Sequence, residues 1–226
     1  MVFVKKKTKI IIVIISSIVA SLALAVGIPF IIFGVKSHEI DNSWSYLKED
    51  ATYSQKVEVT GLNLVTQHIS CGYASIEMMS DYYGNKVTED ELSARNGGKV
   101  STQTTDGFHK EISRSITTKS FASQFYLKND HFLKTIHDAL SRNNPVAIEW
   151  AALYEGQWTL HFSVVSSLDL SNDQVIVYNP YGYIETINVS KFINRTTFKA
   201  YTNLPFFLAF GFAYGAFHKN ALFYAI

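Results

Sequence analysis

The sequence has 226 residues and a formal net charge of +1, but its charges are unevenly distributed. Residues 1–36 contain five lysines and no acidic residue, whereas the other 190 residues carry 15 basic against 19 acidic side chains. The five lysines are Lys5, Lys6, Lys7, Lys9 and Lys36. Because binding to phosphate backbones needs clustered basic side chains, the mildly acidic body argues against a nucleic-acid partner.

The first predicted element is a membrane-spanning helix at residues 10–35. This segment has no charged residue, and at about 1.5 Å per residue it spans a hydrocarbon core of roughly 30 Å even when tilted. The lysines before it mark the cytoplasmic side, so the chain after Lys36 is expected outside the cell membrane. Secretion after signal cleavage is the alternative, because residues 23–25 (ALA) form a small-residue cleavage pattern. The strongly apolar residues 26–35 favour the uncleaved anchor.

The chain is predicted to have three parts. Residues 1–36 form the cytoplasmic lysines and the signal anchor. Residues 37–60 are polar without a clear period and are interpreted as a tether. Residues 61–226 are long enough for one folded domain with a substantial core.

Helices are predicted in the first half of this domain. Residues 71–83 place apolar side chains at helical spacing and end at a C-cap glycine, Gly84. Residues 88–91 (TEDE) fit a capping box that opens a short helix. Further helices are expected at about 106–115 and 131–143.

Strands are predicted in the second half, after Pro145. Short apolar runs separated by turn residues occupy 146–153, 160–167, 175–178 and 184–189. Helices followed by strands predict an α+β fold with a mostly antiparallel sheet. For the apolar stretch 205–217 we expect final strands, with residues 221–226 pairing into the sheet. A membrane-contacting patch or a second anchor at 205–217 is the alternative.

Cys71 is the only cysteine, so the chain can form neither an internal disulfide nor a cysteine-based metal site. No histidine pair has the spacing of a helical zinc motif, and no metal or cofactor is expected. At the start of a predicted helix, the thiol of Cys71 meets unpaired N–H groups and the positive end of the helix dipole, which lower a thiol pKa. A buried cysteine that packs as a small hydrophobe is the alternative.

Three further side chains are candidates for a site around a nucleophilic Cys71. His161, in an apolar predicted strand, is the candidate base. Asn179, at a strand end before a proline, is the candidate for orienting the imidazole. Gln67, four residues before Cys71, is the candidate oxyanion donor together with the Cys71 N–H. Taken alone, each has a structural alternative: a satisfied core histidine, a turn asparagine, or a glutamine without a role.

Four blocks of the sequence carry a resemblance to a known family. They are Gln67 with residues 70–75 (SCGYAS), 144–148 (NPVAI), 161–165 (HFSVV) and 177–182 (VYNPYG). In this order they resemble the bacteriocin-processing peptidases, which are papain-like cysteine peptidases. The resemblance covers about residues 60–190 and implies a papain-like fold. It also implies Cys71 as nucleophile, His161 as general base, Asn179 as orienting residue and Gln67 as oxyanion donor.

The chain departs from this family in two places. The family usually has aspartate where this chain has Asn179, although papain itself uses asparagine, and the spacing from Gln67 to Cys71 is shorter than usual. No Walker motif follows, so leader processing coupled to export is not implied.

We therefore expect a membrane-anchored, extracytoplasmic cysteine peptidase. It would cleave a peptide or amide bond in a peptide or protein substrate through a thioester on Cys71. An acyltransferase or transpeptidase on the same fold, and a non-catalytic surface binding or immunity-type module, are the alternatives.

Overall fold

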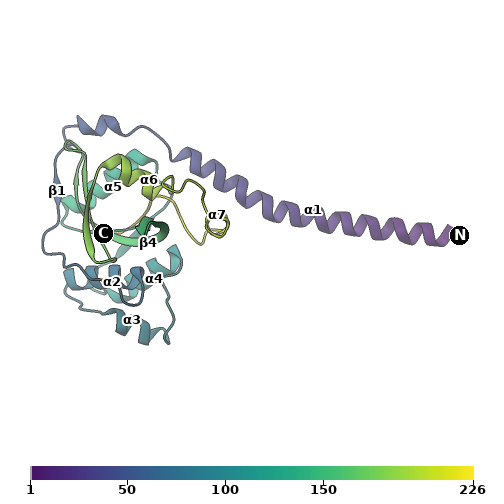
Figure 1. Cartoon of the computed structure of the whole chain (residues 1–226), viewed down its shortest axis with the longest axis horizontal. Helices are drawn as coiled ribbons and strands as arrows, with labels where there is room; N and C mark the ends of the chain where they lie inside the picture. The colour runs from purple at the N-terminus through teal and green to yellow at the C-terminus, as the bar shows by residue number, and fades with distance from the viewer. Residues whose placement is uncertain (1) are drawn as a thin grey trace.

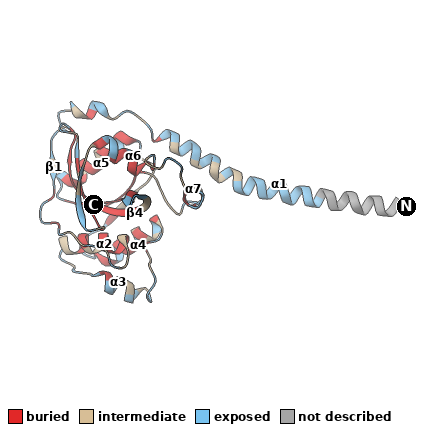
Figure 2. Cartoon of the chain, viewed as in Figure 1, coloured by how far each residue is buried: buried red, intermediate tan, exposed pale blue. Residues whose placement is uncertain are grey.

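The long N-terminal helix projects from the folded body of the chain (Figure 1). The computed structural model describes the backbone of residues 2–226 and the side chains from Ile14 onward. The side chains of the predicted cytoplasmic lysines at 5–9, and of residues 10–13, lie outside this described part. Helix α1 (Val2–Glu39) is continuous, and none of its described side chains is buried (Figure 2). An 18-residue window within Ile14–Glu39 has a mean hydropathy of 2.6, which is apolar enough for a membrane span or a signal peptide.

Four helices of the folded body lie close to the predicted ranges: α2 (Cys71–Tyr82), α3 (Glu89–Arg95), α4 (Thr105–Ser115) and α5 (Asn129–Ser141). Three more were not predicted as helices: η1 (Ser45–Lys48), α6 (Val189–Thr196) and α7 (Phe206–Ala213). The capping box at Thr88 and Glu91 is present. Gly84 ends α2 with φ +77°, and the next N–H, that of Asn85, returns to the carbonyl of Ser80 at 2.9 Å.

Seven strands form one antiparallel sheet, which confirms the predicted α+β class. The strands are β1 (Val57–Glu58), β2 (Phe121–Gln124), β3 (Val146–Tyr154), β4 (Gln157–Asp169), β5 (Gln174–Asn179), β6 (Tyr183–Ile187) and β7 (Ala221–Ala225). Their order is β2-β7-β3-β4-β5-β6, and β1 pairs with β4. All pairings are antiparallel, and successive hairpins join β3 through β6.

Helices cover both faces of this sheet, so its central strands are apolar on both sides (Figure 1). On β3, Ile148 and Trp150 face a cluster with α5 and α6, whereas Ala147 faces a cluster with α2 and α4. This alternation follows from the two-residue period of a strand. It explains why β3 appears in the sequence as an apolar run that only Glu149 interrupts.

The segment interpreted as a tether, residues 37–60, lies against the folded body. Ile40, Leu47 and Val59 are buried, and the Val59 N–H donates to the carbonyl of Ser166 at 2.8 Å. The division of the chain into anchor, tether and peptidase domain stays a prediction.

The prediction of final strands was correct for β7 but wrong for the stretch 205–217. Residues 206–213 form helix α7, which begins after Pro205 and is followed by Gly215 with φ +77°. The stretch is apolar on every side, so its sequence contains no period that separates a helix from a strand. Its main packing partner, as shown below, is α1 rather than the sheet. Strand β2 and helix α6 were not predicted.

Candidate active site

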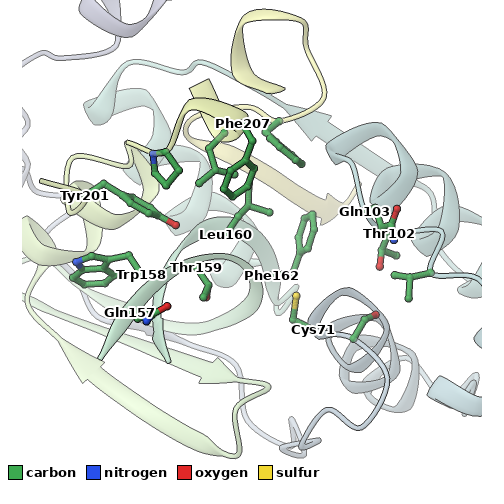
Figure 3. A pocket seen from close by; sticks show the side chains of 15 residues that line it. Cys71, Thr102, Gln103, Gln157, Trp158, Thr159, Leu160, Phe162, Tyr201 and Phe207 are labelled. Carbon is green, nitrogen blue, oxygen red and sulfur yellow. The ribbon is translucent and has the colours of Figure 1, made fainter. Parts of the chain in front are cut away.

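Cys71 is the first residue of α2, and its sulfur faces a cavity (Figure 3). The preceding Ser70 is extended, and its hydroxyl accepts a hydrogen bond from the Tyr73 N–H at 3.1 Å, which caps the helix. The cavity has a volume of about 580 Å³. The half-buried thiol is therefore accessible to a ligand in this cavity.

The cavity walls come from distant parts of the chain. Strand β4 supplies Trp158, Leu160 and Phe162, and the region of α7 supplies Phe207 and Leu208 (Figure 3). Polar groups are few, which is usual for a site that takes an apolar group and orients it with a small number of hydrogen bonds.

The Cys71 sulfur meets β4 where β5 ends. The pairing of β5 with β4 reaches only Val164 and Tyr178. Beyond this pair, the backbone N–H of Phe162 is near enough to the Cys71 sulfur to favour the thiolate form. Phe162 directly follows His161 on β4.

His161 is buried on β4 and hydrogen-bonded to Asn179 at the end of β5. His161 Nε2 and Asn179 Oδ1 are 2.9 Å apart. Tyr181 stacks on the imidazole with ring centroids 4.0 Å apart, and its hydroxyl is 2.8 Å from Thr159 Oγ1. The predicted base and the predicted orienting residue are thus brought together.

The orientation of the Asn179 amide follows from its other partners. Its Oδ1 also accepts the Tyr181 backbone N–H at 3.0 Å, and its Nδ2 donates to Glu185 Oε1 at 2.7 Å. A backbone N–H can only donate and a carboxylate can only accept, so the amide cannot be reversed. His161 Nε2 must therefore carry the proton. In the neutral ring this leaves Nδ1 as the basic nitrogen.

Burial favours the neutral forms of both Cys71 and His161. Desolvation lowers the pKa of His161 to about 3, and the hydrogen bond that its Nε2–H donates to Asn179 only partly opposes this. Desolvation raises the pKa of Cys71 to about 11, although the N–H groups of Phe162 and Gly72 act in the opposite direction. The expectation that the helix start would lower the thiol pKa was wrong in sum, because desolvation outweighs those N–H groups. No hydrogen bond between the Cys71 sulfur and the His161 ring is found among the described residues.

Gln67 lies beside the turn that follows Asn179. Its backbone N–H donates to the carbonyl of Pro180 at 2.8 Å. Its side-chain Oε1 is buried and has no partner within the described part of the chain. The backbone of Gln67 is thus anchored next to Asn179, and the oxyanion role of its side chain stays a prediction.

Sequence reasoning missed Glu89, which holds the loop between Gln67 and Cys71. This fully buried carboxylate accepts the backbone N–H groups of His68, Ile69 and Ser70 at 3.0, 3.0 and 2.9 Å. The sequence showed Glu89 only as part of a helix start. No pattern in the neighbouring sequence indicates that Glu89 contacts residues 68–70.

Thr102, also missed, lies against the residue after the nucleophile. A Cβ on Gly72 would lie 2.2 Å from Thr102 Oγ1, so only glycine fits at position 72. The Thr102 hydroxyl is buried without a partner among the described residues, and Thr102 lines the cavity.

Fold and site together define a class of protein. A cysteine at a helix start, packed on an antiparallel sheet that carries a histidine hydrogen-bonded to an asparagine, is the arrangement of papain-like cysteine peptidases. The Peptidase_C39 like family matches residues 52–206, and the chain belongs to this family. Both the fold and the family expected from the sequence are confirmed.

Solved structures agree with this assignment. A chain described as a C39-like peptidase from Bacillus anthracis has a TM-score of 0.51 at 12% identity, covering 76% of this chain and 98% of that one. A double glycine motif protease from an AMS/PCAT transporter, in complex with the leader peptide, has 0.49 at 14%, covering 76% and 99%. The peptidase domain of Streptococcus ComA, a bifunctional ABC transporter of a quorum-sensing pathway, has 0.45 at 16%, covering 73% and 98%. Only the first score supports the fold. Curated proteins give no match.

Proposed function

We propose that this protein is a cysteine peptidase that hydrolyses a peptide or amide bond through a thioester on Cys71. The observation that carries the proposal is the fixed His161 and Asn179 pair on the strands against which the helix start at Cys71 packs. Because Asn179 holds the proton on Nε2, Nδ1 can accept the thiol proton. Membership in a peptidase family supports the same chemistry.

The steps follow from this arrangement. His161 Nδ1 takes the proton of Cys71 as the sulfur attacks the carbonyl carbon, and the resulting oxyanion is stabilised by the Cys71 N–H and the Gln67 amide. The imidazolium then protonates the leaving amine as the carbon–nitrogen bond breaks, which leaves a thioester. Attack by water, with His161 again as base, releases the acid and restores the thiol. An amine in place of water would make the same protein an acyltransferase or transpeptidase.

The proposed location is the outer face of the cell membrane, with α1 as an uncleaved anchor. The apolar length of α1 and the lysines before it support this topology. Secretion after cleavage near residue 25 is the alternative. The mass of the protein recovered from cell membranes separates the two, since cleavage removes about 25 residues.

One observation favours a second candidate, a non-catalytic binding module. The thiol pKa is raised and the described residues show no Cys71–His161 hydrogen bond, as expected for a cysteine that is not used as a nucleophile.

Hydrolysis of a peptide library by the full chain in detergent, with Cys71→Ala as control, tests the enzyme. We expect the control to lose activity by orders of magnitude. If a thiol-directed peptide electrophile labels only denatured protein and no peptide is cleaved, the binding module is correct.

A further inference from the structure

Helix α7 packs on the outer end of α1 through aromatic side chains (Figure 1). The Phe30 ring lies 6.4 Å from that of Phe206 and 6.2 Å from that of Phe210. One turn further along α1, the Phe33 ring stacks on that of Phe212 at 5.5 Å. The folded body therefore contacts the apolar part of α1 and not only its end.

A hydrogen bond within this contact points to its surroundings. Pro29 in α1 has no N–H, so the carbonyl four residues earlier, that of Ala25, has no helical partner. The Tyr214 hydroxyl donates to this carbonyl at 3.1 Å. In water the carbonyl could bond to solvent, whereas in hydrocarbon an unsatisfied carbonyl costs several kcal/mol. Tyr214 thus supplies the bond that a helix at membrane depth requires.

The outer side of α7 is apolar and uncovered. Phe206 is 74% exposed, Phe207 69%, Tyr214 46% and Phe210 40%. Neighbouring exposed aromatic side chains are typical of membrane contacts, and aromatic residues gather at the level of the lipid headgroups.

The length of α1 places this patch at the outer boundary of the bilayer. The uncharged residues 10–35 extend about 39 Å as a helix, roughly 9 Å more than a 30 Å hydrocarbon core. If the core begins at Ile10, it ends near residue 29, which leaves Phe30 and Phe33 at the boundary. Lys219 lies beside Phe33 at this boundary, with Nζ 4.9 Å from the centre of the Phe33 ring.

The same segment forms a wall of the Cys71 cavity, through Pro205, Phe207 and Leu208 (Figure 3). We propose that α7 rests on the outer surface of the bilayer, and that the Cys71 site acts on peptide segments lying at that surface. Apolar side chains of such a peptide enter between β4 and α7. The inference rests on the proposed anchor and peptidase activity, and it adds the class of substrate.

The depth of α7 is measured without reference to catalysis. The full chain carries Cys71→Ser and one new cysteine, either Phe206→Cys or Phe207→Cys. The new cysteine is labelled with an environment-sensitive fluorophore, and the protein is inserted into phosphatidylcholine–phosphatidylglycerol vesicles. The matched control is Ala94→Cys on α3, an exposed site far from α1 (Figure 1). We expect lipid-borne spin labels to quench positions 206 and 207 severalfold more than position 94, and aqueous iodide to show the reverse order. Equal iodide quenching at all three positions would overturn the membrane contact.

The substrate class is tested with three apolar peptide electrophiles on the wild-type full chain in the same vesicles. The first probe is a soluble peptide. The second carries a palmitoyl group directly on the peptide, and the third carries a long Gly-Ser spacer between its palmitoyl group and the peptide. A site at the surface reacts with the directly palmitoylated probe at least as fast as with the spaced one. If, of the two palmitoylated probes, only the one with the spacer reacts with Cys71, the proposal is overturned. If none of the three labels Cys71, the proposed nucleophile fails, whereas the quenching result on α7 still stands.

Discussion

Replacing Asn179 with aspartate tests why this chain has an amide where the peptidases that it resembles usually have a carboxylate. Asn179 Nδ2 donates to Glu185 Oε1 at 2.7 Å, and Glu185 is itself paired with Arg195. In Asn179→Asp an oxygen would replace Nδ2 and face the Glu185 oxygen directly. The variant therefore loses a hydrogen bond to a charged acceptor and gains a like-charge contact.

The expected loss of stability is about 3 kcal/mol. A hydrogen bond to a charged group contributes roughly 1.5–3 kcal/mol, and the repulsion, moderated by Arg195, adds to it. For a chain of this size the melting temperature should fall by about 6–12 °C. The double variant Asn179→Asp with Glu185→Gln exchanges donor and acceptor across the pair, and it should recover most of this loss.

Thermal unfolding of the full chain in detergent at pH 7 provides the test, as a cycle of wild type, both single variants and the double variant. The double variant should also show an acid limb of kcat/KM at higher pH than wild type, since a carboxylate beside His161 raises the pKa of the imidazole. The reasoning is refuted if Asn179→Asp melts like wild type, or if adding Glu185→Gln restores nothing.

Three further predictions follow from the buried charges of the site. The rate of alkylation of Cys71 by iodoacetamide should rise about tenfold per pH unit from pH 7 to 9, because the thiol pKa of about 11 lies above its usual 9.0. A rate that is already constant below pH 7 would indicate a preformed thiolate–imidazolium ion pair instead. Glu149 is buried on β3, and its Oε2 accepts a hydrogen bond from the Thr105 hydroxyl at 2.6 Å. Burial raises the pKa of Glu149 to about 8, so its contribution to stability is full below pH 4.5 and is lost as the pH rises through 8. Glu149→Gln should remove this dependence in urea unfolding between pH 5 and 9, and a wild-type curve that is flat there contradicts it. Glu89→Ala should lower the free energy of unfolding by about 3–5 kcal/mol, because three backbone N–H groups lose their acceptor. The control Asp90→Ala, at the exposed neighbouring residue, should change the free energy of unfolding by under about 0.5 kcal/mol. Equal effects of the two variants in chemical denaturation would disprove the role of Glu89.

The sequence predicted the elements whose pattern is local. Strands β3 to β6 appear as apolar runs between turn residues, and α2 has helical spacing with a glycine at its end. Helix α7 could not be predicted in this way, because its partner, α1, lies about 170 residues earlier and its apolar stretch has no period. Strand β2 (FASQ) was missed because four residues of mixed polarity carry no pattern; it is stabilised by pairing with β7 at the end of the chain.

The same distinction between local patterns and contacts made on folding applies to the candidate site. Cys71, His161 and Asn179 stand in blocks of sequence that resemble those of a known family, so these three residues could be proposed as site residues from the sequence. Glu185 and Glu89 could not, because each acts through a contact made only after folding. The β5–β6 hairpin places Glu185 opposite Val177, two residues before Asn179, so that its carboxylate reaches the Asn179 amide diagonally. Helix α3 brings Glu89 under a loop about 20 residues earlier.

The raised thiol pKa changes the account of how Cys71 would be activated. At a helix start alone, the N–H groups and the dipole would favour the thiolate. In the folded protein the sulfur is desolvated more strongly than these groups compensate, and the buried imidazole is neutral for the same reason. In the proposed mechanism neither group gains from ionising by itself, so the proton would pass from sulfur to Nδ1 as the carbonyl is attacked, when the new negative charge moves to an oxygen with N–H donors of its own. A substrate that fills the cavity would then be part of the activation, and the proposed mechanism predicts that the apolar wall formed by α7 affects the rate as well as binding.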